Sequence, residues 1–240
     1  MPSNAYAQLA AEYYDALHKT CRNFDAATKS ALARHPVALG NDGLILEVGC
    51  GRGRCQEFLG VSNDRVVQLD SCRAMLAMVD REPAVVRILA DAASVPLFDA
   101  QFSAVVGFLI DSFIGLAFFA EAYRLLLPGG VLFVTVPAAE WGYSLRGSKE
   151  PEVSVARFIT KSRHTVLVPS TLITGTRIDE MLRYCGFQFI SIDFEPLPPG
   201  VTPISPDVET AASSYGVAVH ELPLVYLIRA SKPVQEPLRV

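Results

Sequence analysis

Short runs of apolar and β-branched residues alternate along this chain with segments of helical periodicity. The runs predict strands at residues 44–48, 66–70, 85–90, 102–110, 131–136, 187–194 and 224–230. Helical periodicity covers 6–33, as one or two helices, and then 55–59, 74–79, 118–127 and 176–185. This alternation predicts an α/β fold in which a mostly parallel sheet is covered by helices on both faces.

Residues 138–169 break this rhythm, because they are polar and aromatic, with a possible strand at 164–168. We interpret them as an insertion above the sheet. Residues 195–206 contain five prolines and predict a loop. The resulting scheme is one domain with four parts: an N-terminal helical lid (1–36), a cofactor-binding core (37–137), a substrate-side insertion (138–170), and a C-terminal helix with strands (171–240).

Composition excludes several classes of protein. Half of the 240 residues are apolar and 19% are charged, so a disordered chain is excluded, and the net charge of -4 offers no basic face for nucleic acid. Asp111 and Glu121 interrupt the longest apolar stretch, and the N-terminus has no signal-peptide pattern, which predicts a soluble protein without a membrane partner. The five cysteines never form a CxxC pair, which favours a reducing, cytoplasmic compartment.

A glycine-rich turn carries the chemistry. Residues 47–53 read Glu-Val-Gly-Cys-Gly-Arg-Gly between a predicted strand and a predicted helix. Such a turn lets the backbone approach a ligand closely, and the helix after it presents free N–H groups. Asp70 ends the second strand, where a carboxylate can accept both hydroxyls of a ribose, and Asp91 ends the third, within reach of an adenine amino group. The pattern predicts a nucleotide-like cofactor.

These segments resemble the class I S-adenosylmethionine-dependent methyltransferases. Residues 46–53 are similar to the family's first motif, 69–76 to its ribose-binding segment, Asp91-Ala92 to its adenine-binding turn, and Leu-Pro-Gly-Gly at 127–130 to the turn before its fifth strand. The resemblance covers 44–136 well and 176–194 more loosely. It implies a doubly wound, Rossmann-like sheet of seven strands, the last antiparallel, with S-adenosylmethionine as cofactor and S-adenosylhomocysteine as product.

The resemblance also implies roles for individual residues. Glu47 and the glycine loop would hold the methionyl part, Asp70 the ribose, Met75 the adenine face and Asp91 the adenine edge. Tyr14 is our candidate for an aromatic ring beside the sulfonium, and Arg22 for a partner of the methionyl carboxylate, although core packing and a solvated helix face are the competing explanations. The full predicted cofactor set is Tyr14, Arg22, Glu47, Gly49, Cys50, Gly51, Gly53, Asp70, Ser71, Met75, Asp91, Ala92 and Phe108.

The acceptor is less defined by the sequence. Residues 109–113 lack the Asp/Asn-Pro-Pro-aromatic tetrad of nucleobase amino-methyltransferases, and 137–140 lack the Asp-Asn of metal-dependent catechol methylation, so we predict a small-molecule acceptor and no metal. Whether oxygen, nitrogen or carbon is methylated stays open. His164 and Asp111 are the candidate catalytic bases, with strand and helix capping as their alternative roles, and His18 is expected to line the same cavity.

Two other functions fit part of the pattern. An NAD(P)-dependent oxidoreductase would use the same glycines and Asp70, but its third glycine would stand where this chain has Arg54. A non-catalytic S-adenosylmethionine-binding protein would share the cofactor residues and lack a substrate cavity. The assembly predicted for any of these is a monomer or a homodimer.

Overall fold

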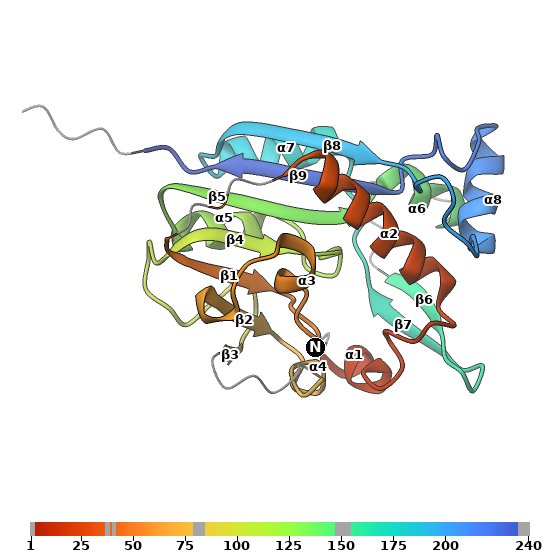
Figure 1. Cartoon of the computed structure of the whole chain (residues 1–240), viewed down its shortest axis with the longest axis horizontal. Helices are drawn as coiled ribbons and strands as arrows, with labels where there is room; N and C mark the ends of the chain where they lie inside the picture. The colour runs from red at the N-terminus through yellow and green to blue at the C-terminus, as the bar shows by residue number, and fades with distance from the viewer. Residues whose placement is uncertain (1–2, 37–38, 40–41, 79–84, 147–154, 235–240) are drawn as a thin grey trace, which may run out of the picture.

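The computed structural model describes residues 3–36, 39, 42–78, 85–146 and 155–234. Within these ranges seven strands form a sheet in the order β3-β2-β1-β4-β5-β9-β8 (Figure 1). The strands β1 to β5 run parallel, and β9 is antiparallel to both of its neighbours. Their bounds are β1 (Leu44–Val48), β2 (Val66–Asp70), β3 (Val86–Leu89), β4 (Phe102–Gly107), β5 (Leu126–Pro137), β8 (Gln188–Glu195) and β9 (Val225–Ser231). The predicted fold class is confirmed.

Neighbouring residues of the central strands enter different cores, because side chains alternate between the two faces of a sheet. Leu46 packs in a cluster with Phe118 of α5 (Leu116–Leu125) and Ile178 of α7 (Gly175–Tyr184). Ile45 packs in a second cluster, with residues of α2 (Lys19–Arg34) and α3 (Cys55–Leu59). Both faces of the sheet are therefore buried, which explains the nearly continuous apolar runs of β1 and β4.

A further group of elements lies beyond the carboxyl ends of the parallel strands. It comprises α1 (Ser3–Leu9), α6 (Ala139–Arg146), α8 (Pro206–Tyr215), the N-terminal half of α2, and a hairpin of β6 (Val155–Ile159) and β7 (Thr165–Pro169) (Figure 1). The hairpin packs on α1 through a cluster that includes Leu9, Phe158 and Val168. These elements surround the sheet edge at which the loops after β1, β2 and β4 emerge.

The elements that the sequence pattern does not predict lie in this group. They are helix α6, strand β6 and helix α8, and residues 147–154 of the proposed insertion lie outside the described residues. Strand β6 alternates exposed Val155, Arg157 and Ile159 with inward-facing residues, so it lacks the apolar run of a buried strand. Helix α8 begins at Pro206 just after the predicted proline loop, and the hydroxyl of Ser205 caps it.

Several helices are shorter than their periodicity predicts. The segment 6–33 divides into α1 and α2 with a turn at residues 10–18, and α4 covers only Arg73–Leu76, while Val79 of the predicted helix lies outside the described residues. A short 3₁₀ helix, Asn63–Arg65, precedes β2. No helix in the described part of the chain is long and apolar enough to cross a membrane.

Candidate active site

The glycine loop between β1 and α3 is shaped by side chains that press against it. Gly49 and Gly51 have φ angles of +58° and +54°, which side-chain-bearing residues rarely adopt. A Cβ on Gly49 would lie 2.7 Å from the Phe113 ring, and one on Gly51 would overlap the Tyr14 hydroxyl oxygen. Glycine is needed at both positions for its conformation and for the space it leaves, so the loop forms a cradle without side chains.

Two buried carboxylates accept hydrogen bonds from backbone N–H groups of this loop. Glu47 accepts hydrogen bonds from the Arg54 backbone N–H (2.6 Å) and from Gln68 Nε2 (3.2 Å), and burial raises its pKa to about 7. Asp70 accepts from the backbone N–H groups of Gly51 (2.9 Å) and Cys72 (2.8 Å), and burial raises its pKa. Asp70 therefore ties the end of β2 to the glycine loop.

The turn between α1 and α2 covers the loop from above. The Tyr14 hydroxyl accepts a hydrogen bond from the Arg52 backbone N–H (3.2 Å), and the Arg52 guanidinium lies 4.6 Å from the centre of the Tyr14 ring. Tyr14 meets Tyr13 edge to face at 5.1 Å, and Tyr13 stacks on Phe158 of the hairpin at 5.5 Å. A chain of aromatic rings thus links the glycine loop to β6.

A cavity of about 860 Å³ lies between the glycine loop, α2 and the hairpin. It is lined by most of the residues predicted for the cofactor: Tyr14, Arg22, Glu47, Gly49, Cys50, Gly51, Asp70, Ser71, Met75, Asp91, Ala92 and Phe108. Asp111, predicted for the acceptor side, lines it as well, and so does His18. Segments that are far apart in the chain therefore converge on one space, as their positions at strand ends predict.

Two predicted residues lie elsewhere. Gly53 is not among the lining residues; its backbone N–H donates to the Cys50 carbonyl (2.7 Å) and closes the turn behind the cradle. The expectation that His164 packs over the cavity was wrong. His164 is exposed at the turn of the hairpin, where its Nδ1 lies 3.3 Å from the Ser162 hydroxyl. His164 belongs to the turn that precedes β7, and an apolar strand pattern alone does not reveal where such a turn ends.

The structure also brings in residues that sequence reasoning missed. They are Ser170 and Arg146 of the cavity wall. Phe158 and Trp141 line the cavity too, in the segment that the sequence predicts above the acceptor, and Trp141 of α6 meets Phe24 edge to face at 4.8 Å. Ser170 follows β7, and no local motif marks it.

Arg54, at the position where a dinucleotide-binding loop would have its third glycine, holds the loop and α2 together. Its guanidinium is almost fully buried and pairs with Asp25 of α2 (3.2 Å) and with Glu57 of α3 (2.8 Å), and it stacks on the Phe58 ring at 4.2 Å. The carboxylates raise the pKa of Arg54 against the opposing effect of burial. A glycine here would remove these two ion pairs and the contact with the Phe58 ring.

The comparisons with known proteins agree with this geometry. Residues 46–134, from β1 to β5, match the family model described as a methyltransferase domain. Together with the solved structures, these matches indicate a class I S-adenosylmethionine-dependent methyltransferase. A relative from Mycolicibacterium smegmatis, named as a probable S-adenosylmethionine-dependent methyltransferase, is 35% identical over 96 residues, which are 39% of this chain and 37% of that protein. The match therefore spans little more than a third of this curated relative.

Solved methyltransferase structures share the fold over most of both chains. A structure titled as the DhpI–SAM–HEP complex aligns with a TM-score of 0.64 at 22% identity, covering 95% of this chain and 94% of its own. An S-adenosylmethionine-dependent methyltransferase from Mesorhizobium loti aligns with a TM-score of 0.58 at 16% identity, covering 87% and 100%. At these identities the likeness concerns the fold, and the cofactor of the family is S-adenosylmethionine.

The residues of this methyltransferase fit that cofactor. Asp70 uses one oxygen for each backbone N–H, and a carboxylate offers about four acceptor sites, so both hydroxyls of a ribose can still be accepted. Asp91 accepts a local hydrogen bond from the Ala93 N–H (2.9 Å) through one carboxylate oxygen and keeps further acceptor capacity. Met75, buried in α4, adds an apolar wall.

Proposed function

We propose that this protein transfers a methyl group from S-adenosylmethionine to a small-molecule acceptor. The observation that carries the proposal is the cavity itself, which runs from the glycine loop and Asp70 to Asp111, Trp141 and the hairpin. Its volume of about 860 Å³ is near the upper end of the range of roughly 300–1,000 Å³ for ligand sites, which supports room for a second molecule beside the cofactor.

The chain would divide the work between two sets of residues. The glycine cradle, Glu47, Asp70 and Asp91 would hold the cofactor, which supplies an electrophilic methyl group on a sulfonium sulfur. The acceptor would lie beyond, among Tyr13, Phe158 and Asp111. The rings of Tyr13 and Phe158 stack on each other and are largely buried, so they would exclude water from the acceptor and fix its orientation.

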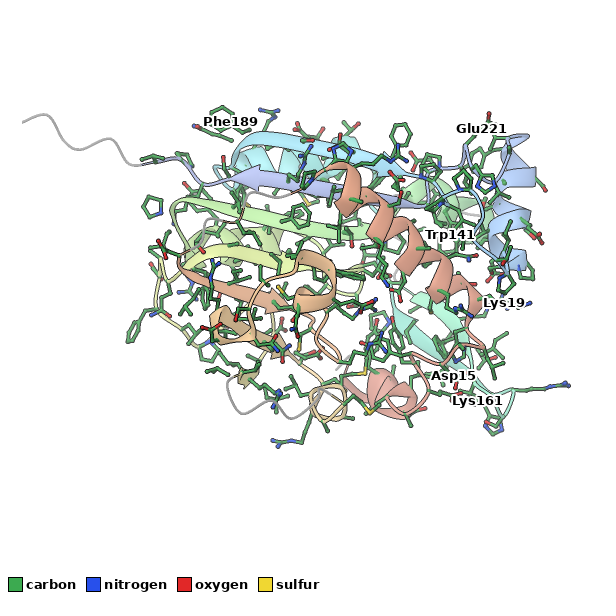
Figure 2. All side chains as sticks on the ribbon, in the orientation of Figure 1. Asp15, Lys19, Trp141, Lys161, Phe189 and Glu221 are labelled. Carbon is green, nitrogen blue, oxygen red and sulfur yellow. The ribbon has the colours of Figure 1, made fainter. Side chains whose placement is uncertain are left out.

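Contacts between the hairpin and the α1–α2 turn support a lid over this space. Lys161 at the hairpin turn forms an ion pair with Asp15, and its backbone N–H donates to the Glu12 carboxylate (2.7 Å). Figure 2 shows Asp15 and Lys161 side by side, on the same side of the molecule as Lys19 and Trp141, whereas Phe189 lies at the opposite end. The Tyr6 hydroxyl donates to the Pro169 carbonyl (3.3 Å) and adds a third link.

Asp111 is the better candidate for a group that acts on the acceptor, because it lines the cavity and His164 does not. All five cysteines are free, which suits the reducing, cytoplasmic setting that we propose.

An oxidoreductase is less well supported, since Arg54 fills the place of the third glycine with a buried ion-pair network. A cofactor-binding protein without a substrate site would have little use for the open space beneath the hairpin.

Calorimetric titration tests the proposal. We expect S-adenosylhomocysteine to bind the protein at a ratio of one to one, and NAD and NADP to show no binding under the same conditions. Binding of NAD or NADP without binding of S-adenosylhomocysteine would refute the proposal. Transfer of tritium from methyl-labelled S-adenosylmethionine to extracted small metabolites then tests catalysis, and its absence with intact cofactor binding would favour the non-catalytic alternative.

A further inference from the structure

The acceptor end of the cavity contains a carboxylate with an unusual environment. Asp111 follows β4, lines the cavity and is half-buried. Its backbone carbonyl accepts from the Thr171 N–H (2.8 Å), which fixes the segment after β7 against the end of β4. Burial raises the pKa of Asp111 to about 6, so that at neutral pH the side chain is still mostly an anion.

Arg146 and Ser170 form a short chain of hydrogen bonds that ends at the Asp111 carboxylate. Arg146 of α6 donates from Nη1 to the Ser170 carbonyl (2.9 Å) and from Nη2 to the Ser170 hydroxyl oxygen (2.7 Å). A guanidinium can only donate, so the Ser170 hydroxyl keeps its own proton for the Asp111 carboxylate. Ser170 is almost completely buried, whereas Asp111 lines the cavity, and a carboxylate has about four acceptor sites, more than the Ser170 hydroxyl uses.

The groups that interact electrostatically with Asp111 from the lid are neutral. Tyr6 and Tyr13, on α1 and the turn after it, and Cys21 on α2 all have pKa values raised above their usual range, with burial as the main cause. They remain protonated at neutral pH and offer hydroxyl, thiol and aromatic surfaces. A cation benefits from aromatic faces in addition to a carboxylate.

Six lysine and arginine side chains line the cavity. Arg54 is buried and paired with Asp25 and Glu57, and Arg146 donates to Ser170. The other four are exposed. They are Lys19, Arg22, Arg157 and Lys161, and Lys161 is paired with Asp15. Water and salt screen charges in such positions far more than they screen a charge in a buried pocket. At the inner end an acceptor therefore meets the carboxylate of Asp111, while the guanidinium of Arg146 in the same wall is engaged with Ser170.

We propose that the acceptor of this enzyme is an amine, which enters as an ammonium ion and is bound by Asp111 between the rings of the lid. The ammonium would give one proton to the Asp111 carboxylate, so that the neutral amine has a lone pair for the new nitrogen–methyl bond while the sulfur keeps the electrons of the broken sulfur–methyl bond. This inference rests on the proposed methyltransferase function and specifies its substrate class. A carboxylate or phosphate at the same place would be repelled by Asp111. An alcohol would also donate a hydrogen bond to the carboxylate, but without the attraction between opposite charges that an ammonium adds.

Matched probes test the inference without knowledge of the natural acceptor. The wild-type protein is saturated with S-adenosylhomocysteine and titrated calorimetrically with 2-phenylethylamine, 2-phenylethanol and phenylacetate, and then with hexylamine and 1-hexanol. We expect each amine to bind roughly tenfold or more tightly than its alcohol, because only the ammonium carries a charge opposite to that of the carboxylate, and phenylacetate to bind most weakly. Alcohol or acid binding as tight as amine binding would overturn the inference, and so would a failure of both amines to bind.

A variant then assigns the preference to Asp111. Asp111→Asn should lower amine affinity roughly tenfold and alcohol affinity much less, because the amide keeps the shape and a hydrogen-bond acceptor but removes the charge. Glu180→Gln, on the exposed surface of α7 and paired with Arg177, is the control and should change neither. A preference that persists in Asp111→Asn would overturn the inference. If that variant does not fold, the wild-type comparison still decides the substrate class.

The two levels of the proposal fail in different ways. Loss of S-adenosylhomocysteine binding would refute the methyltransferase function itself. Normal S-adenosylhomocysteine binding with no preference for amines would refute only the inference about the acceptor.

Discussion

Replacing Gly51 by alanine separates two costs that the structure predicts at the glycine cradle. The first is conformational, because alanine at a φ of +54° carries the left-handed penalty of roughly 1–2 kcal/mol. The second is steric, because the new Cβ would overlap the Tyr14 hydroxyl oxygen and the tyrosine would have to move. Gly60, which ends α3 with a φ of +65°, has nothing within 4 Å of its would-be Cβ, so Gly60→Ala carries the first cost alone.

The steric cost follows from what Tyr14 loses. Its hydrogen bond from the Arg52 N–H is worth about 0.5–1.5 kcal/mol, and the contact of the Arg52 guanidinium with its ring about 0.5–1 kcal/mol. We therefore expect Gly51→Ala to lower the free energy of unfolding by about 1–2.5 kcal/mol more than Gly60→Ala does. The affinity for S-adenosylhomocysteine should fall as well in Gly51→Ala and stay unchanged in Gly60→Ala, since Gly51 lines the cavity and Gly60 does not.

Urea unfolding and calorimetric titration measure both effects. The double variant Tyr14→Ala with Gly51→Ala adds a direct test, because without the tyrosine ring the new Cβ has room. In that background Gly51→Ala should cost no more stability than Gly60→Ala costs in the wild type. If Gly51→Ala and Gly60→Ala lose equal stability and equal affinity in the wild-type background, the close approach of Tyr14 to the loop is not a constraint and the reasoning is wrong.

Three further predictions concern the cofactor, the lid and the acceptor end. Asp70→Ala should weaken S-adenosylhomocysteine binding by about 1.5–3 kcal/mol in calorimetry, the value of hydrogen bonds to a charged group, and unchanged affinity in a folded variant would remove the ribose assignment. Lys161→Ala should speed limited proteolysis of residues 155–169 roughly twofold to fivefold, because it removes the ion pair with Asp15, whereas Arg183→Ala on α7 should have no effect. For Asp111 the pKa is higher in the folded state, about 6, than the usual 3.8, so its ionisation opposes folding and stability falls as pH rises between these values. Asp111→Asn should thus gain stability relative to the wild type between about pH 4 and pH 7, by at most about 3 kcal/mol in urea titrations, and a pH-independent difference would contradict the raised pKa.

The sheet and the cofactor end of the cavity could be predicted because their signals are local. A strand buried on both faces needs a continuous apolar run, and β2 has the predicted bounds Val66–Asp70. The glycine cradle needs φ angles that glycine supplies, so its sequence is visible within seven residues. The carboxyl ends of parallel strands meet at one edge, which is why the order of strands and acidic residues along the chain is enough to place Asp70 and Asp91 beside the loop.

The acceptor end depended on contacts between elements that have no fixed spacing in the chain. Arg146 on α6, Ser170 after β7 and Asp111 after β4 meet because the hairpin folds back over the sheet edge. Whether a side chain on such a hairpin faces the cavity or the solvent depends on its position in the strand register. For this reason Phe158 lines the cavity while His164, at the turn of the same hairpin, is exposed. The sequence by itself determined the fold and the cofactor cradle, since both follow from backbone conformation and periodicity over a few residues. Only the tertiary structure decided which charge meets the acceptor, because that charge depends on burial and on partners brought together from distant parts of the chain.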